Sequence, residues 1–186
     1  MLSTETTSLK SLFSKGCVFA YPTEAVFGLG CDPLNESALN LLLELKQRPV
    51  EKGVILVADC WERVSSFVAS DQLSDKQMQE VLATWPGFVT WLLPKSDDAP
   101  DWITGGSDLI AIRISAHPIV QSLCASIESA LVSTSANITG EEAIKNRHQL
   151  EQVFKDKVIY IDGELGGADK PSQIRNALSG QIVRGN

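Results

Sequence analysis

Hydrophobic positions in the first quarter of the chain switch between helical and strand spacing. Apolar residues at i, i+3 and i+4 over 9–13, followed by a glycine, predict a short helix with a glycine stop. The apolar run 17–21 is rich in strand formers and predicts a strand, and we expect a loop over 23–33. Asn35 can then cap a helix with an apolar face that ends ahead of Pro49.

The middle of the chain continues this alternation. The apolar run 53–58 predicts a strand that is buried on both faces, and Asp59 can cap a helix after it. Ser74 and Gln77 have the spacing of a capping box, which predicts the start of a helix that extends to Thr84. Strands and helices therefore follow one another closely in this region.

The last part of the chain adds further elements of both kinds. In chain order we expect a strand over 88–93, a loop over 97–106, a strand over 109–114, a helix from Pro118, a strand over 131–133, a helix over 146–155, a strand over 158–161 and a hairpin of 173–176 with 181–184. Because helices and strands interleave throughout, the predicted fold class is α/β with a mixed sheet.

Composition and charge narrow the class of protein. The 186 residues include 44% hydrophobic side chains, which is typical of a globular protein, and the length fits a single domain over 1–186. Against 16 Lys plus Arg stand 23 Asp plus Glu, so the formal charge is 16 − 23 = −7. This balance disfavours a protein that binds nucleic acid through bulk charge.

Membrane and secreted classes are also disfavoured. The longest uninterrupted apolar run, 54–58, is far shorter than the roughly 20 residues of a membrane-spanning helix. The first residues lack a basic start followed by an apolar core, so we expect no secretory signal and a cytoplasmic protein. Cys17, Cys31, Cys60 and Cys124 form no CxxC pair and are interpreted as reduced core thiols.

Common catalytic and nucleotide motifs are missing. His117 and His148, the two histidines, lack the neighbours of a nucleophile pair or a metal site, and we interpret them as structural or solvated. The sequence has no GxxxxGK[ST] motif, and Gly28-x-Gly30 is followed by Pro33 where a dinucleotide fingerprint has its third glycine. A P-loop or Rossmann nucleotide site is therefore excluded.

A dispersed set of cations remains for interpretation. Lys46, Arg48 and Lys52 lie within seven residues at a predicted helix end, where they either complement the helix dipole or neutralise a polyphosphate. Arg113 interrupts an apolar strand, and such a charge is costly unless it is paired. It forms either a buried salt bridge or the contact to a ligand carboxylate or phosphate, and Arg184 ends the predicted hairpin.

Small polar side chains gather after one predicted strand. The stretch 133–140 contains Ser133, Ser135 and Asn137 among its hydroxyl and amide groups. It is either an ordinary capped turn or a place where a phosphate or nucleoside binds at the carboxyl end of a strand. Ser172, after a proline, is a weaker signal and by itself is interpreted as structural.

Together these segments resemble a known family. The sequence YPTEAVFGLG at 21–30 resembles its N-terminal signature, residues 46–48 match its K-x-R motif, and residues 135–137 match its S-x-N motif. The blocks 85–90, 111–113 and 171–175 fall in the expected order. The chain is thus similar to the YrdC/TsaC family of threonylcarbamoyl-AMP synthases, and most of all to the short, single-domain bacterial TsaC form.

The resemblance implies a fold and a reaction. The implied fold is of the YrdC type, a twisted mixed parallel and antiparallel sheet flanked by helices with a concave, basic cavity. The implied reaction joins L-threonine, bicarbonate or CO₂, and ATP into threonylcarbamoyl-AMP and pyrophosphate. That product serves N6-threonylcarbamoyladenosine formation at position 37 of tRNA, where other proteins perform the final transfer.

The resemblance also implies roles for individual residues. Threonine is assigned to Thr23, Arg113, Ser133 and Ser172, with Arg113 as the partner of its carboxylate; ATP is assigned to Lys46, Arg48, Ser135, Asn137 and Arg184, with Lys52 as an extra phosphate contact. Lys46, Arg48 and Arg113 are the implied catalytic residues. Mg²⁺ is expected to be held by the phosphates of ATP and by water, so we expect no dedicated metal site.

Two other functions stay open at this point. An RNA-binding or ribosome-maturation protein could use the same cavity without forming an adenylate, and its binding would weaken steeply with salt. The negative net charge and the lack of an RNA module with stacking aromatics disfavour it, although RNA binding in the cavity is kept as a possible property. A regulatory binder of threonine or ATP without turnover is the third alternative.

Overall fold

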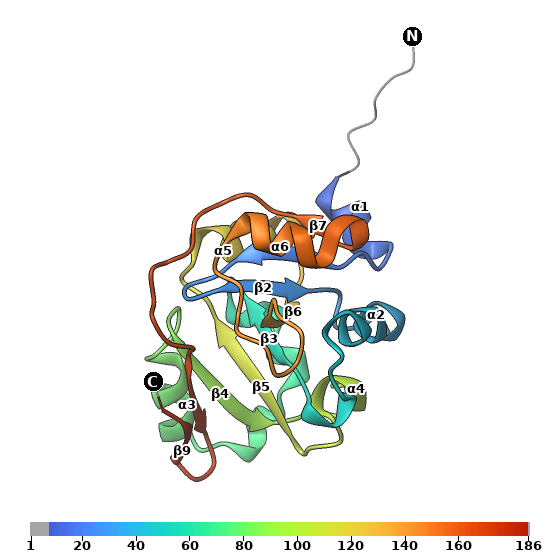
Figure 1. Cartoon of the computed structure of the whole chain (residues 1–186). Helices are drawn as coiled ribbons and strands as arrows, with labels where there is room; N and C mark the ends of the chain where they lie inside the picture. Colours follow the sequence, from blue (N-terminus) through green and yellow to red (C-terminus); the bar gives the residue numbers. More distant parts are fainter. Residues whose placement is uncertain (1–7, 186) are drawn as a thin grey trace.

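The computed structural model describes residues 8–185, and one mixed sheet runs through them in the strand order β7-β1-β2-β6-β3-β5-β4-β8-β9 (Figure 1). Pairs β1/β7, β3/β5 and β4/β8 are parallel, and the other neighbouring pairs are antiparallel, which confirms the predicted α/β class. The strands are β1 (Phe19–Pro22), β2 (Phe27–Gly30), β3 (Ile55–Ala58), β4 (Val89–Pro94), β5 (Leu109–Ile114), β6 (Leu131–Ser135), β7 (Ile159–Tyr160), β8 (Gln173–Asn176) and β9 (Ile182–Arg184).

Helices flank this sheet and connect its strands. The α-helices are α1 (Leu9–Ser14), α2 (Glu36–Lys46), α3 (Asp75–Leu82), α4 (Asp101–Thr104), α5 (Pro118–Ile127) and α6 (Arg147–Phe154), and the 3₁₀ helices are η1 (Val50–Lys52), η2 (Trp61–Arg63), η3 (Ser65–Phe67), η4 (Ser70–Gln72) and η5 (Lys155–Lys157).

The caps read from the sequence define several of these helices. The side chain of Asn35 accepts a hydrogen bond from the backbone N–H of Ala38 at the start of α2. Ser74 and Gln77 form both hydrogen bonds of a capping box at the start of α3. Because such caps satisfy backbone donors locally, their sequence signals predict the helix starts correctly.

The two faces of the sheet bury different side chains, as the period of two along a strand requires. On β1, Phe19 and Tyr21 pack with α1 and α5, whereas Ala20 belongs to the larger cluster on the opposite face. On β3, Val57 packs with α5 while Leu56 belongs to the larger cluster. Each such large apolar side chain contributes about 1.5–3 kcal/mol when it is fully buried.

Helix α5 covers only part of its face of the sheet, and this positions the site. Leu131 and Val57 lie in the cluster that α5 covers, and Ile55 packs at the edge of that cluster. Ile55 also lines a cavity, together with Ala111 and Arg113 on the neighbouring strand β5. This part of the sheet therefore forms the floor of a cavity.

Three predicted elements differ in the structure. The expected loop 23–33 contains strand β2, because residues 27–30 pair with both β1 and β6. After Asp59 two 3₁₀ helices replace the expected α-helix, and the Asp59 carboxylate pairs with Arg63 at 2.5 Å instead of capping a helix. The expected loop 97–106 contains the one-turn helix α4.

The four cysteines differ in their burial. Cys17, Cys31, Cys60 and Cys124 are free thiols; Cys31 and Cys124 are buried, as expected for core residues, whereas Cys17 and Cys60 are partly exposed. Within residues 8–185, none of the helices is long and apolar enough to cross a membrane.

Candidate functional site

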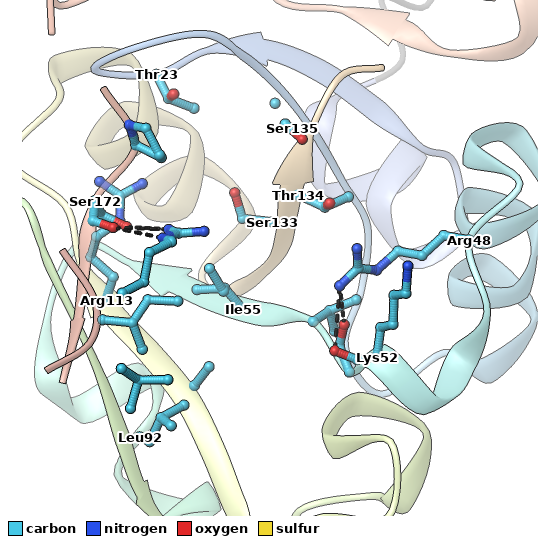
Figure 2. A pocket seen from close by; sticks show the side chains of 18 of the residues that line it. Thr23, Arg48, Lys52, Ile55, Leu92, Arg113, Ser133, Thr134, Ser135 and Ser172 are labelled. Carbon is cyan, nitrogen blue, oxygen red and sulfur yellow. Dashed lines mark hydrogen bonds between the residues drawn. The ribbon is translucent and has the colours of Figure 1, made fainter. Parts of the chain in front are cut away.

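A cavity of about 520 Å³ lies on the part of the sheet that α5 leaves uncovered. This volume is within the range of small-molecule sites. Its described lining contains four cations and one acid, Glu51, so that positive charge prevails. The sequence-predicted residues that line it are Thr23, Arg48, Lys52, Arg113, Ser133, Ser135, Ser172 and Arg184, most of them drawn in Figure 2.

The cations lie in two groups at opposite ends of the cavity. Arg48 and Lys52 follow α2 and form what we name the Arg48 end (Figure 2). Arg113, on β5, and Ser172 lie together on the other side, and with Arg184 they form the Arg113 end. The fold thus brings together cations that lie more than sixty positions apart in the sequence.

At the Arg48 end, the guanidinium is fixed by the chain that follows it. Arg48 Nη2 donates hydrogen bonds to the carbonyl oxygen of Gly53 at 2.9 Å and to that of Lys52 at 3.3 Å. Its Nε is buried and has no hydrogen-bond partner among the described residues. Burial lowers the pKa of Arg48, which nevertheless stays charged at neutral pH. The site therefore presents a fixed cation, which suits an anionic ligand.

At the Arg113 end, the guanidinium is paired within the protein. Arg113 Nη1 lies 2.5 Å from Glu24 Oε1, and both side chains are mostly buried. Ser115 Oγ donates to the same carboxylate oxygen at 2.7 Å. Burial alone would raise the pKa of Glu24, but the charge of Arg113 and the Ser115 hydroxyl hold it below its usual value. Of the two interpretations of Arg113, the buried salt bridge is confirmed, and the same side chain also lines the cavity.

The second cation of this end comes from the last strand. Arg184, on β9, donates to the carbonyl oxygen of Ser172 from Nε at 3.2 Å and from Nη2 at 2.9 Å. The buried Ser172 hydroxyl is in turn 2.9 Å from the hydroxyl of Thr90 on β4. Burial and the nearby Arg113 lower the pKa of Arg184. These contacts fix the position of β8 and β9 over the cavity.

Hydroxyl groups lie between the two ends. Tyr21 is fully buried on β1, and its hydroxyl donates to Ser133 Oγ at 2.9 Å. Burial raises the pKa of Tyr21, so the phenol stays protonated and the Ser133 hydroxyl hydrogen remains available to a ligand. Thr23 Oγ1 donates to the carbonyl oxygen of Val26 at 2.7 Å and so stabilises the turn between β1 and β2.

Two glycines on β2 allow this strand to lie close to the Tyr21 ring and to β6. A Cβ at Gly28 would lie 3.3 Å from the Tyr21 ring, and one at Gly30 would overlap the carbonyl oxygen of Val132 on β6. Larger side chains would therefore displace Tyr21 or separate β2 from β6. This explains the glycines of the 21–30 segment, which do not form a phosphate-binding loop.

Lys46 and Asn137 do not line the cavity. The Lys46 side chain is 2% exposed, and its Nζ donates to the carbonyl oxygens of Ser135 and Asn137, the latter at 2.8 Å. Burial and the nearby Arg48 lower the pKa of Lys46 to about 8. Asn137 Oδ1 accepts from Ser135 Oγ at 2.6 Å, and its Nδ2 donates to backbone carbonyls. The direct contacts of both residues with ATP stay predictions.

Sequence reasoning gave no role to several side chains that shape the site. Glu24 pairs with Arg113, Tyr21 holds Ser133, and Thr90 contacts Ser172. The guanidinium carbon of Arg113 also lies 5.5 Å from the centroid of the Phe88 ring, a cation–π contact. A charge on an apolar strand signals a buried acid, but no local pattern identifies Glu24, 89 positions earlier, as that acid.

The donor set of the cavity suits anions better than a resident metal ion. Among residues 8–185, no group of three or more His, Cys, Asp or Glu side chains is placed to hold a metal. His117 is buried with its Nε2 3.1 Å from the carbonyl oxygen of Glu164, and His148 lies on the surface of α6 near Gln152. Both histidines therefore have the structural or solvated environments expected for them.

Comparisons with known proteins identify the family of this chain. The sequence profile of the Sua5/YciO/YrdC family, described as telomere recombination, matches residues 11–185. A threonylcarbamoyl-AMP synthase of Pseudoalteromonas atlantica is 51% identical over 171 residues, which are 92% of this chain and 91% of that protein. One of Xanthomonas euvesicatoria is 51% identical over 172 residues, 92% of each chain, and one of Vibrio campbellii is 47% identical over 177 residues, 95% of each.

Solved structures share the fold. The crystal structure of P. abyssi Sua5 complexed with L-threonine superposes with a TM-score of 0.82 at 30% identity, covering 90% of this chain and 49% of that one, so this chain spans about half its length. E. coli YciO superposes with a TM-score of 0.80 at 21% identity, covering 94% of this chain and 85% of that one, which supports the fold alone. By its sequence and its fold, the chain belongs to the Sua5/YciO/YrdC family.

Proposed function

We propose that this protein is a threonylcarbamoyl-AMP synthase, which makes threonylcarbamoyl-AMP and pyrophosphate from L-threonine, bicarbonate or CO₂, and ATP. Relatives with this name share about half of their residues with it over nearly their whole length. The observation that carries the proposal is the cavity with cations at two opposite ends and hydroxyls between them. Such a cavity can hold an amino-acid carboxylate at one end and a polyphosphate at the other.

Threonine occupies the Arg113 end in this proposal. Arg113 faces the cavity and pairs with the carboxylate, and Thr23, Ser133 and Ser172 supply hydroxyl contacts. A guanidinium is suited to this task because its planar donors match a carboxylate in two parallel hydrogen bonds. Threonine as a ligand is supported by the relative P. abyssi Sua5, which was crystallised with L-threonine.

The triphosphate of ATP crosses the cavity toward the Arg48 end. Arg48 and Lys52 neutralise the outer phosphates there, and Ser135 contacts the nucleotide between the two ends. Arg184 lies beside the threonine position, which suits contact with the α-phosphate because that phosphate must come within bonding distance of the amino acid. The assignment of Arg184 to ATP is therefore compatible with its place at the Arg113 end.

In this proposal, Lys46 and Asn137 act on ATP binding indirectly, by holding the 135–137 loop in place. Lys46 ties down the carbonyl oxygens of Ser135 and Asn137, and Asn137 holds the Ser135 hydroxyl. The K-x-R and S-x-N motifs are thus joined behind the wall of the cavity. Their mutual contacts fix the loop that places Ser135 against the nucleotide.

The chemistry needs no protein nucleophile. The free amine of threonine adds to CO₂ and loses a proton, and an oxygen of the resulting carbamate attacks the α-phosphorus as pyrophosphate leaves. The protein then contributes position and charge neutralisation, which Arg113, Arg48 and Lys52 can supply. Mg²⁺ fits as an ion carried by the phosphates, where it would neutralise their charge, because the cavity offers few carboxylates.

The product is chemically labile and must be consumed by a transfer reaction. We assign that step to the proteins that form N6-threonylcarbamoyladenosine at position 37 of tRNA, in the cytoplasm. Direct RNA binding in the cavity is not needed for the reaction. Threonine, ATP and bicarbonate are the ligands that the site itself must recognise.

Pyrophosphate release tests the proposal directly. Purified protein is incubated with ATP and Mg²⁺, with threonine and bicarbonate each omitted in turn, and with serine in place of threonine. We expect release that requires both co-substrates and falls with serine. If threonine and ATP bind but no condition releases pyrophosphate, the protein is a binder and the proposed synthase activity is wrong. If neither ligand binds and RNA does, with a steep salt dependence, the site has been misassigned.

A further inference from the structure

Arg113 is held by a carboxylate that lies outside the wall of the cavity. Glu24 follows Thr23 in the turn between β1 and β2, and its Oε1 lies 2.5 Å from Arg113 Nη1. The side chains are 14% and 7% exposed, so the pair is shielded from solvent. Glu24 itself does not line the cavity among the described residues, whereas Arg113 does. Arg113 thus contacts Glu24 and also lines the cavity.

The Glu24 carboxylate is itself fixed from two sides. Ser115 Oγ donates to its Oε1 at 2.7 Å and accepts the backbone N–H of His117 at 3.1 Å. The Glu24 carbonyl accepts the N–H of Ala168 at 2.8 Å, so the segment between β7 and β8 holds the backbone of the turn. A carboxylate anchored in this way can orient the side chain that it pairs with.

The contact uses only part of what the carboxylate can accept. Glu24 Oε2 is buried and has no hydrogen-bond partner among the described residues. Arg113 Nη1 is also buried without a hydrogen-bond partner among the described residues, so the pair is an ion pair whose hydrogen bonds can still form when the guanidinium turns to face a bound anion. The Phe88 ring also lies beside the guanidinium, with its centroid 5.5 Å from the guanidinium carbon.

Charge balance gives the pair a second consequence. The Arg113 end contains two guanidiniums, Arg113 and Arg184, which repel each other, and Glu24 cancels one of the two positive charges. The remaining single positive charge matches one carboxylate. Without Glu24, the same end would carry two positive charges and would favour a dianion such as a phosphate over the single carboxylate of an amino acid.

We propose that Glu24 is a positioning residue of this site, which orients Arg113 toward the α-carboxylate of threonine and leaves that end with one net positive charge. The inference rests on the proposed function, because it takes threonine as the ligand of the Arg113 end. It assigns Glu24 no contact with the substrate. Its effect must therefore appear in the recognition of the carboxylate and not in binding as a whole.

The test compares two ligands on variant proteins by isothermal titration calorimetry. L-Threonine and L-threoninamide differ only in the carboxylate, which the second ligand replaces by an amide. The Kd of threoninamide divided by the Kd of threonine therefore reports how well Arg113 recognises the carboxylate. We expect Glu24→Gln to weaken threonine binding at least tenfold and threoninamide binding less than threefold. Glu51→Gln removes the same charge at the Arg48 end and should leave the ratio unchanged.

A milder variant guards against loss of folding. Ser115→Ala removes only the hydroxyl that anchors Glu24, and we expect it to reduce the ratio in the same direction by two- to fivefold. Equal losses for both ligands in the folded variants, or no loss for either, would overturn the positioning role while leaving the proposed function intact. Wild-type protein that binds no threonine would overturn the proposed function and this inference with it.

Discussion

Replacing Lys46 by methionine separates the charge of this buried side chain from its volume. Lys46 is 2% exposed, and among the described residues its ammonium donates hydrogen bonds to the carbonyl oxygens of Ser135 and Asn137. The fall of its pKa from 10.5 to about 8 corresponds to about 3 kcal/mol by which the folded state disfavours the charged form. The two charge-assisted hydrogen bonds of the ammonium, worth about 1.5–3 kcal/mol each, offset this cost. Lys46→Met should therefore lower the free energy of unfolding by only about 0–3 kcal/mol at pH 7.

The same substitution should affect catalysis far more than stability. Without the ammonium, the loop of Ser135 and Asn137 loses two anchors, and small displacements of a reacting group cost about 100-fold in rate. We expect pyrophosphate release to fall by at least this factor in a protein that still unfolds cooperatively. Wild-type activity in a folded Lys46→Met protein would show that the loop does not need its lysine.

The pH dependence of stability gives an independent check. Between pH 8 and 10.5 the unfolded chain keeps a proton on Lys46 that the folded chain has lost, so the cost of burying the charge disappears as pH rises through this window. The free energy of unfolding of the wild type, relative to Lys46→Met, should increase by about 3 kcal/mol from pH 7 to pH 10.5. Urea denaturation of both proteins measures this difference, in which other titrating groups cancel. A difference that does not change with pH would refute the reasoning.

Three further substitutions test the packing and the charge of the cavity. Gly30→Ala should lower the free energy of unfolding in urea by about 1–3 kcal/mol, because its methyl group would overlap a carbonyl oxygen of β6, whereas Gly185→Ala, with open space around it, should have no effect; equal stability of the two would contradict this packing. Tyr21→Phe should cost about 1 kcal/mol of stability and raise the KM for threonine several-fold, since Ser133 loses its buried partner; an unchanged KM would show that this hydroxyl is not oriented by the tyrosine. Arg48→Gln should raise the KM for ATP at least tenfold and reduce the salt dependence of that KM while leaving the KM for threonine unchanged; equal increases in both KM values would place Arg48 outside the phosphate end.

Local patterns in the sequence determined most of the secondary structure. Asn35 and the Ser74–Gln77 capping box place helix starts because each cap satisfies backbone groups within a few residues. The expected strand over 109–114 matches β5, because the run of apolar strand-forming residues in this segment is enough to predict it. Where a strand depends on distant partners, as β2 does on β6, the local sequence of 23–33 indicates only a loop.

The sequence also predicted an anion site and the residue types that would form it. The short motifs at 46–48 and 135–137, with Arg113, predict an anion site. In the structure, Arg48, Ser135 and Arg113 line the cavity. What these motifs cannot show is which member faces the ligand. Lys46 and Arg48 are two positions apart, and only the packing of α2 against the 135–137 loop turns one into the interior and leaves the other on the cavity wall.

The amino-acid sequence by itself thus determined the order of helices and strands, the acidic overall charge and the kinds of side chain available for an anion site. Only the tertiary structure decided that Glu24 pairs with Arg113, that Tyr21 holds Ser133 and that Lys46 is buried. The reason is physical: caps and periodicity act over a few residues, whereas these contacts join positions about 90 to 110 residues apart. These pairs form only when the strands of the nine-stranded sheet are in the correct order and register, and the position of each strand depends on its neighbours.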